Sequence, residues 1–258
     1  MSEQNDIKPI EKITEVAEAA HEAAHAETAP APVRRYRAVL FQLVLLLIVV
    51  AFGGLTFMVK TTPSFPIDLK ITLGLQSINT PLFGELMTIV SWAGFQPQST
   101  IITVLIVLVI YGFGLHWEAL MALMAAIFSS AINVLVKDLI QRPRPANPLV
   151  RVLETLTSYS FPSGHVMFYT VFFGFIWFLA FSLLKPSLKR SLLLVFFGSL
   201  VLLVGVSRIY LGEHWASDVL GAYLLASLTL VIIIQVYRWG KTRFFIHQPV
   251  AATKPQEA

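Results

Sequence analysis

The chain has 258 residues, of which 56% are hydrophobic and only 13% are charged. Soluble domains carry about 25% charged residues, so the composition excludes an ordinary water-soluble globule. The absence of cysteine excludes disulfides and thiolate metal sites. The formal net charge of +4 does not indicate nucleic-acid binding, because the basic residues flank apolar runs, as membrane topology requires.

The two ends of the chain are expected to be polar tails. Residues 1–33 are acidic and rich in alanine, and have little apolar surface to bury. They do not form a signal peptide, because the basic-then-apolar pattern begins only at Arg34. We predict a solvated cytoplasmic tail over 1–33, a membrane domain over 34–243 and a short cytoplasmic tail over 244–258.

Long apolar runs predict an all-α polytopic membrane protein. A bilayer core about 30 Å thick needs about 20 apolar helical residues. Between the first and second runs, a weaker stretch near 82–95 is broken by Pro81, Gly84 and Gly94, and we expect it to lie in the interface or to be re-entrant. The six predicted transmembrane helices cover about 38–59, 98–115, 118–136, 166–184, 191–210 and 216–237.

The orientation follows from the basic residues in short connections. With six spans, three basic clusters fall on one side together with both termini, and a seventh span would scatter them. That side is expected to be cytoplasmic, in a cell membrane. The clusters are Arg34, Arg35 and Arg37; Lys185, Lys189 and Arg190; and Arg238, Lys241 and Arg243.

The opposite face collects a second set of ionisable residues, for which topology gives no reason. Such groups at a membrane boundary are costly unless they are paired or functional. Taken singly, Arg142 and Arg151 are interpreted as interfacial anchors, and Glu213 as a solvated neighbour of His214. The full set is Lys137, Arg142, Arg144, Arg151, His165, Arg208, His214 and Asp218.

Five of the residues on this face suit the binding of a phosphoryl group. Lys137, Arg144 and Arg208 supply positive charges from distant parts of the chain, and fixed cations stabilise the charge of a transferring phosphoryl group. Ser163 and Gly164 open a helix, where free N–H groups and the helix dipole attract anions. The pattern therefore predicts phosphoryl transfer.

Two histidines divide the chemistry. Asp218 follows His214 by four residues, so both lie on one helical face, and a carboxylate fixes the tautomer of a nucleophilic histidine. His165 remains as the general acid, which protonates the leaving oxygen and later activates water. No carboxylate cluster suits Mg²⁺ or Zn²⁺, so we expect no metal and no other cofactor.

Three segments resemble the signatures of the type 2 phosphatidic acid phosphatase (PAP2) superfamily, whose patterns are Lys-x6-Arg-Pro, Pro-Ser-Gly-His and Ser-Arg-x5-His-x3-Asp. All three match in order and without departure. They read Lys137 to Arg144-Pro145, Pro162 to His165, and Ser207-Arg208 to His214 and Asp218. The resemblance covers about 115–237 directly, and the six-span plan extends it to residue 38.

The resemblance implies the fold and the role of each matching residue. It implies an all-helical core shared with vanadium haloperoxidases and acid phosphatases. By it, His214 is the nucleophile, Asp218 orients it and His165 is the acid. The positions that would hold phosphate are Lys137, Arg144, Ser163, Gly164 and Arg208, with Ser207 less directly involved. The compact form looks like bacterial members that act on undecaprenyl pyrophosphate, phosphatidylglycerophosphate or phosphatidic acid from the outer membrane face.

Several functions remain open at this point. The leading hypothesis is a metal-independent lipid phosphate or pyrophosphate phosphatase that uses a phosphohistidine, with a lipid phosphate and the bilayer as partners and no obligate protein partner. A phosphotransferase would use the same residues with an acceptor other than water. A transporter is disfavoured because the charged residues gather at one face and no repeats with broken helices are evident. The intact His165, His214 and Asp218 argue against an inactive scaffold.

Overall fold

The computed structural model describes residues 31–62, 64–146, 148–154 and 156–245. The chain divides into two units, residues 1–47 and 48–258, and helix α2 (Ala31–Thr61) begins in the first and ends in the second. All elements that position the site belong to the second unit. Most of the two predicted tails, 1–30 and 246–258, lies outside the described residues.

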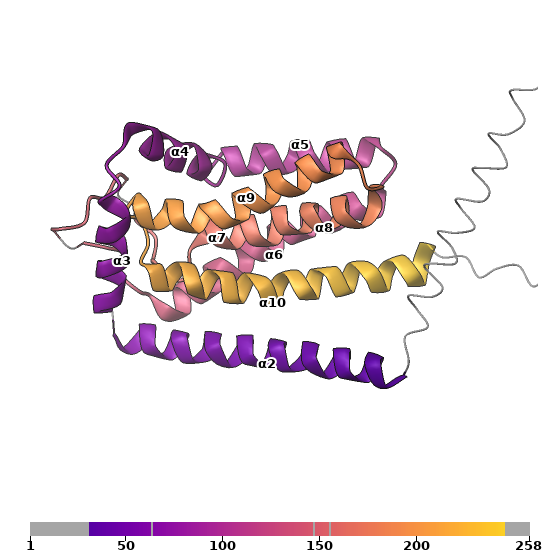
Figure 1. Cartoon of the computed structure of the whole chain (residues 1–258), viewed down its shortest axis with the longest axis horizontal. Helices are drawn as coiled ribbons and strands as arrows, with labels where there is room; N and C mark the ends of the chain where they lie inside the picture. The colour runs from indigo at the N-terminus through magenta and orange to yellow at the C-terminus, as the bar shows by residue number, and fades with distance from the viewer. Residues whose placement is uncertain (1–30, 63, 147, 155, 246–258) are drawn as a thin grey trace, which may run out of the picture. The chain divides into compact units, whose positions relative to one another are not determined.

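The second unit is all-helical in its described part (Figure 1). Helices α7 and α8 are joined by the π-helical turn η1, so that Gly164 to Leu183 is one continuous helical run. After α2 the elements are α3 (Pro66–Gln76), α4 (Pro81–Trp92), α5 (Gln98–Gly112), α6 (His116–Ile140), α7 (Gly164–Phe168), η1 (Tyr169–Phe173), α8 (Gly174–Leu183), α9 (Leu188–Tyr210), α10 (Ala216–Gly240) and η2 (Lys241–Phe245).

The long helices confirm the predicted all-α polytopic fold. In Figure 1, α5, α6, α8, α9 and α10 run along one common direction, and α3 crosses one end of this bundle, where it packs against α9 and α10. Five described stretches are long and apolar enough to cross a membrane. They are Arg35–Thr61, His116–Ile140, Gly164–Leu183, Leu188–Tyr210 and Ala216–Phe244.

The expected number of six spans is not confirmed, because of α5. This helix has 15 residues, Gln98–Gly112, where the sequence suggested a run to about residue 115. At about 1.5 Å per residue it is about 22 Å long, short of a bilayer core of about 30 Å. It packs along α6 and is connected to it by a short turn.

The helical segment expected near 82–95 is present as α4, and a second helix, α3, precedes it. Two helices fill the segment, α3 and α4, each with proline in its first turn, at Pro66 and Pro81. Proline is well placed there because the first N–H groups of a helix have no partner within it. Pro81 therefore begins a helix and does not merely interrupt one, and α3 was not predicted at all.

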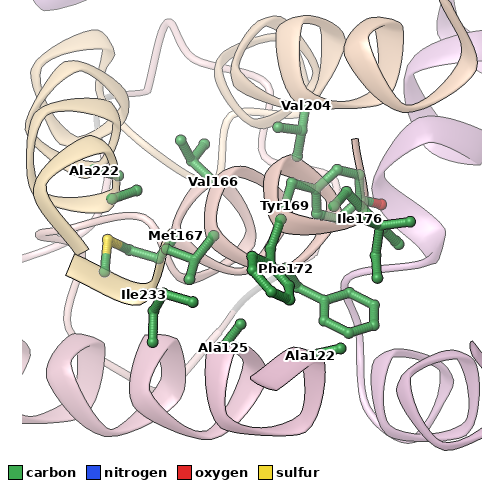
Figure 2. Close-up of a cluster of buried hydrophobic side chains, with 14 of the residues drawn as sticks. Ala122, Ala125, Val166, Met167, Tyr169, Phe172, Ile176, Val204, Ala222 and Ile233 are labelled. Atoms are coloured by element: carbon green, nitrogen blue, oxygen red, sulfur yellow. The ribbon is translucent and has the colours of Figure 1, made fainter. Parts of the chain in front are cut away.

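The core lies where α6, α7, η1 and α10 meet (Figure 2). Alanines with no exposed surface, Ala122 and Ala125 of α6 and Ala222 of α10, face larger side chains such as Phe172. Small residues allow helix backbones to approach closely, which drives helix packing in membranes. The hydroxyl of Tyr169 in η1 donates to the carbonyl of Val90 at 2.5 Å, which ties α4 to this core.

Two helix ends set the position of the site. Helix α6 ends at Ile140 and is capped by Gln141, whose positive φ of 56° turns the chain out of the helix before Pro143. At the start of α10, the carboxylate of Asp218 accepts a hydrogen bond from the N–H of Trp215 at 2.9 Å. Such a reverse cap satisfies an N–H that has no helical partner and orients the carboxylate at the same time.

Candidate active site

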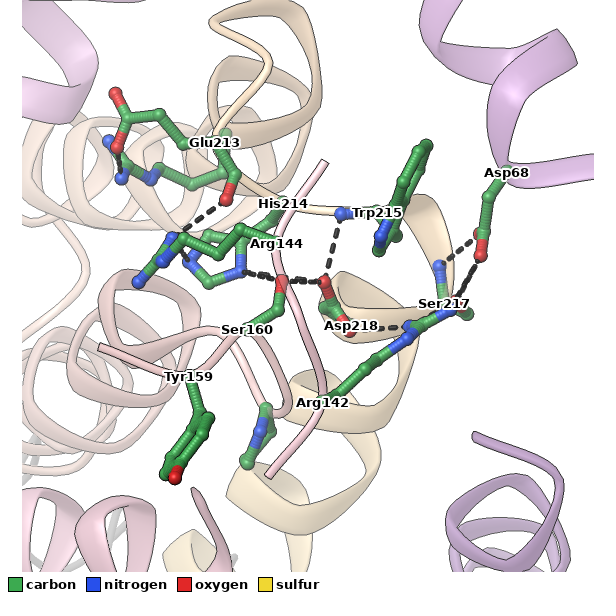
Figure 3. A network of polar contacts seen from close by, with 12 residues as sticks. Asp68, Arg142, Arg144, Tyr159, Ser160, Glu213, His214, Trp215, Ser217 and Asp218 are labelled. Carbon is green, nitrogen blue, oxygen red and sulfur yellow. Dashed lines mark hydrogen bonds and ion pairs between the residues drawn. The ribbon is translucent and has the colours of Figure 1, made fainter. Parts of the chain in front are cut away.

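The three predicted segments meet at one end of the bundle. Figure 3 shows Arg144, Ser160, His214 and Asp218 pointing toward one another, from the segment after α6, the segment before α7, and the α9–α10 connection with the first turn of α10. The N–H of Ser163 donates to the carbonyl of Asp218 at 3.3 Å, which joins the start of α7 to α10. Residues up to 74 positions apart in the sequence, Arg144 and Asp218, thus form one site.

His214 has a defined tautomer in this arrangement. Its Nε2 lies 3.2 Å from Nη1 of Arg144, and a guanidinium can only donate, so Nε2 must be the unprotonated nitrogen. The proton then resides on Nδ1, which faces Oδ2 of Asp218 at 3.6 Å. The nitrogen with the free lone pair therefore points toward a cationic group, as a nucleophile for a phosphate would.

Asp218 is fully buried and is held by several donors. Oδ2 accepts from the hydroxyl of Ser160 at 2.5 Å, in addition to the N–H of Trp215. Oδ1 accepts from Nη1 of Arg142 at 2.5 Å. The hydroxyl of Ser160 also lies 3.4 Å from Nδ1 of His214. Ser160 therefore touches both members of the pair, and the sequence had given no sign of it.

The interpretation of Arg142 as an interfacial anchor was wrong. Its side chain is 1% exposed and lies between two carboxylates, Asp218 and Asp68 of α3, the second at 2.9 Å. A buried guanidinium needs such partners, because an unpaired charge there is very unfavourable. Arg151, in contrast, is exposed, and its guanidinium lies 5.4 Å from the ring centre of Tyr210.

The environment of His214 favours its neutral form. Burial is the largest cause, and the positive charges of Arg144, Arg208 and Lys137 add to it, so the pKa of His214 lies well below its usual 6.5. A histidine that is unprotonated at neutral pH is ready to attack phosphorus. The cations that the sequence assigns to phosphate thus also favour the neutral form of His214.

Arg144 is held by backbone and side-chain acceptors. Its Nε donates to the carbonyl of Ser158 at 2.7 Å and its Nη2 to the hydroxyl of the same residue at 2.9 Å. Its Nη1 donates to the carbonyl of Glu213 at 2.7 Å. These contacts fix the plane of the guanidinium beside His214, where its fork can receive phosphate oxygens.

Arg208 is fully buried and paired, and the expectation that Glu213 is a solvated neighbour was wrong. Glu213 is 2% exposed and forms an ion pair with Arg208. Nη1 of Arg208 also donates to the hydroxyl of Ser91, and its guanidinium lies 5.1 Å from the ring centre of Phe95. Glu213 therefore fixes the position of a cation that the sequence assigned to phosphate.

His165 lies beside a cavity and keeps one nitrogen without a partner. Its ring packs edge-on against Phe95, with centroids 4.6 Å apart, and its buried Nε2 has no hydrogen-bond partner among the described residues. The cavity has a volume of about 390 Å³ and opens between α5 and α6, where His165, Gly164 and Phe168 meet residues of both helices. The hydroxyl of Ser163 is likewise buried without a partner in the described part.

Gly164 occupies a position with little room. A Cβ there would lie 3.1 Å from Oδ1 of Asn133, whose amide donates to the carbonyl of Pro162 at 3.0 Å. The remaining predicted residues make structural contacts. Lys137 donates to the carbonyl of Tyr159, and the hydroxyl of Ser207 donates to the carbonyl of Met87 at 2.6 Å, which ties α9 to α4. Their part in phosphate binding stays a prediction.

The sequence of this chain is similar to those of known phosphatases. The profile of the PAP2 superfamily matches residues 118–242. Phosphatidylglycerophosphatase B of Bacillus subtilis is 32% identical over 161 residues, which cover 60% of this chain and 76% of that protein. Sphingosine-1-phosphate phosphatase 2 of Homo sapiens is 34% identical over 111 residues, 39% of this chain and 25% of that protein.

Two solved structures are similar to the fold. The crystal structure of a transmembrane PAP2 type phosphatidylglycerolphosphate phosphatase from Bacillus subtilis matches with a TM-score of 0.67 and 27% identity, over 78% of this chain and 98% of that chain. Aquifex aeolicus LpxE matches with a TM-score of 0.50 and 25% identity, over 67% of this chain and 98% of that chain.

Proposed function

Because this chain belongs to the PAP2 superfamily and is a membrane lipid phosphatase, we propose that it cleaves phosphate from its lipid through a phosphohistidine on His214. The observation that carries the proposal is the orientation of this side chain. Its Nδ1–H faces Asp218, and its Nε2 lone pair faces Arg144, where a phosphate would bind. A neutral imidazole held in this way is a nucleophile.

The first step transfers the phosphoryl group to the enzyme. Arg144, Arg208 and Lys137 receive the phosphate oxygens, together with the N–H groups at Ser163 and Gly164. The Nε2 lone pair forms a bond to phosphorus while the bond from phosphorus to the lipid oxygen breaks. His165 gives its proton to that oxygen, and Asp218 stabilises the charge that develops on the imidazole of His214.

The second step releases phosphate. The leaving alcohol or lipid phosphate departs, and a water molecule takes its place. His165, now unprotonated, accepts a proton from this water, whose oxygen bonds to phosphorus while the bond between phosphorus and Nε2 breaks. Inorganic phosphate leaves, and His165 is again protonated. No metal is required in this sequence of steps, so activity is expected to persist in EDTA.

Phosphatidylglycerophosphate is the first substrate to test, because this chain aligns with most of the length of two relatives that are named for this activity. Undecaprenyl pyrophosphate and phosphatidic acid remain candidates. The cavity beside His165 supports a lipid: it opens between α5 and α6 and is lined by apolar Leu123 and Ile127 as well as hydroxyl groups. A lipid with its headgroup at His165 would have its acyl chains within the bilayer.

The site is proposed to face the outside of the cell, within a phosphatase domain over 34–243. The basic clusters of the α8–α9 turn and the end of α10 lie at the end of the bundle opposite the site (Figure 1). Cytoplasmic connections carry an excess of Lys and Arg, which supports this orientation.

The test is phosphate release by purified protein in detergent with EDTA, from the three lipids named above. The proposal expects free phosphate from at least one lipid and none from the His214→Gln variant. Loss of activity in EDTA that returns with a divalent cation would contradict the metal-free mechanism. Phosphate that appears on an added alcohol and not as the free ion would assign the chain to the transferases.

A further inference from the structure

Asp68 connects helix α3 to the catalytic pair from outside the three signature segments. Its carboxylate is 1% exposed. Oδ2 accepts from Nη2 of Arg142 at 2.9 Å and from the hydroxyl of Ser217 at 2.6 Å, and Oδ1 accepts from the N–H of Ser217 at 2.8 Å. Asp68 therefore holds the residue next to Asp218 and also the guanidinium that binds Asp218 (Figure 3).

Arg142 lies between the two carboxylates with one amino group for each. Nη2 donates to Asp68, while Nη1 donates to Oδ1 of Asp218 and to the hydroxyl of Ser217. A guanidinium is planar and rigid, so the position of one amino group fixes the other. Without Asp68, Nη2 of Arg142 would lose this acceptor, and the fork would shift toward Asp218 and draw that carboxylate away from His214.

The charges of Asp68, Arg142 and Asp218 also support a functional role for Asp68. Two carboxylates and one guanidinium leave one net negative charge, so Asp218 keeps its ability to attract the Nδ1 proton of His214. If Asp68 were neutral, Arg142 would cancel the charge of Asp218. The wrong tautomer of a catalytic histidine is known to lower turnover strongly even when its geometry is retained.

We propose that Asp68 is a positioning residue for His214, acting through Arg142 and Asp218, and that α3 thereby forms part of the catalytic machinery. This inference rests on the proposed function, in which His214 is the nucleophile. The competing explanation is that the ion pair between Asp68 and Arg142 only anchors α3 to the bundle and contributes to stability.

A double-mutant cycle separates the two explanations. In folded protein, Asp68→Asn should lower kcat by about 10- to 100-fold and change KM by less than about threefold, because the interaction acts on the nucleophile. Asp68→Asn combined with Arg142→Gln should be no slower than Arg142→Gln alone, as residues that act as a unit are not additive. A wild-type kcat for folded Asp68→Asn, or multiplying effects in the double variant, would overturn the proposal.

A matched control addresses stability. Glu118 accepts from Lys241 at 2.5 Å and from Tyr237 at 3.0 Å, at the opposite end of the bundle. Glu118→Gln should lower the melting temperature but leave kcat per folded molecule unchanged. If Asp68→Asn gives too little folded protein, Asp68→Glu keeps the charge and displaces the carboxylate, and the same loss of kcat is expected.

The tautomer of His214 gives a readout that needs no lipid. In ¹⁵N-histidine NMR spectra, assigned with His214→Gln, the wild type should show the Nδ1–H form, and Asp68→Asn or Asp68→Glu should show a mixture. A changed tautomer in a protein whose wild type releases no phosphate would refute the proposed function and leave the connection to Asp68 standing. An unchanged tautomer beside an active wild type would refute the connection alone.

Discussion

Nη1 of Arg144 lies 3.2 Å from Nε2 of His214, so the guanidinium covers the nitrogen that we propose attacks phosphorus. In the proposed mechanism a phosphate takes this position, with its oxygens toward the fork of Arg144 and its phosphorus toward Nε2 of His214. The same contact would let Arg144 both bind the substrate and keep His214 in the Nδ1–H tautomer.

Arg144→Lys should lower kcat/KM by about 10²- to 10³-fold, the range found when one donor to a developing charge is removed. A lysine keeps the charge but cannot supply the planar fork that contacts Ser158, Glu213 and His214 together. Steady-state kinetics in detergent would measure the effect. A loss of less than about threefold would show that charge alone suffices at this position.

The pH dependence of kcat/KM should follow His214. Burial, together with the positive charges of Arg144, Arg208 and Lys137, holds the pKa of His214 well below 6.5. His214 therefore becomes protonated, and activity is lost, only as the pH falls through that low value. Arg144→Gln removes one of these positive charges. The pKa of His214 should then rise, and the acid limb of the profile should move to higher pH. If the acid limb does not move in the Arg144→Gln variant, protonation of His214 is not the cause of this limb.

Ser160→Ala should lower kcat by about tenfold or more, because a hydrogen bond to a buried charged group is worth about 1.5–3 kcal/mol. The hydroxyl donates to Asp218 at 2.5 Å and lies 3.4 Å from Nδ1 of His214. Thr229→Ala is the control, since this buried hydroxyl donates to the carbonyl of Leu225 within α10, away from the site. Equal kcat values for the two variants would mean that Ser160 does not act on the pair.

The proposed orientation can be tested by labelling, since the chain has no cysteine of its own. Thr157→Cys, exposed near the site, should react with a membrane-impermeant maleimide in intact cells. Lys185→Cys, exposed in the α8–α9 turn, should react only after the membrane is opened. The reverse pattern would place the site in the cytoplasm.

The sequence predicted the all-helical membrane fold because long apolar runs have one stable solution in a bilayer. It did not predict α3, because this helix is short and carries Asp68 and Lys70 among its apolar residues. The length of α5 was also misjudged, since apolarity continues beyond Gly112 while the helix does not.

Within the site, sequence reasoning brought out residues that lie in spaced motifs, such as His214 and Asp218. It missed Ser160 and Asp68, which contact Asp218 and Arg142 across 58 and 74 positions. No periodicity or spacing marks such contacts, because they arise only when the helices pack. Arg142 and Glu213 stood beside motif residues, yet a charged side chain at a membrane boundary gives the same pattern whether it is exposed or buried and paired.

The proposed mechanism requires a covalent bond between phosphorus and His214. To detect it, the protein would be quenched in alkali during turnover of a ³²P-labelled lipid phosphate, and the label located by peptide mapping. We expect label on His214 that is stable in alkali and lost in acid, and none in the His214→Gln variant. Label on another residue, or rapid turnover by His214→Gln, would contradict this mechanism.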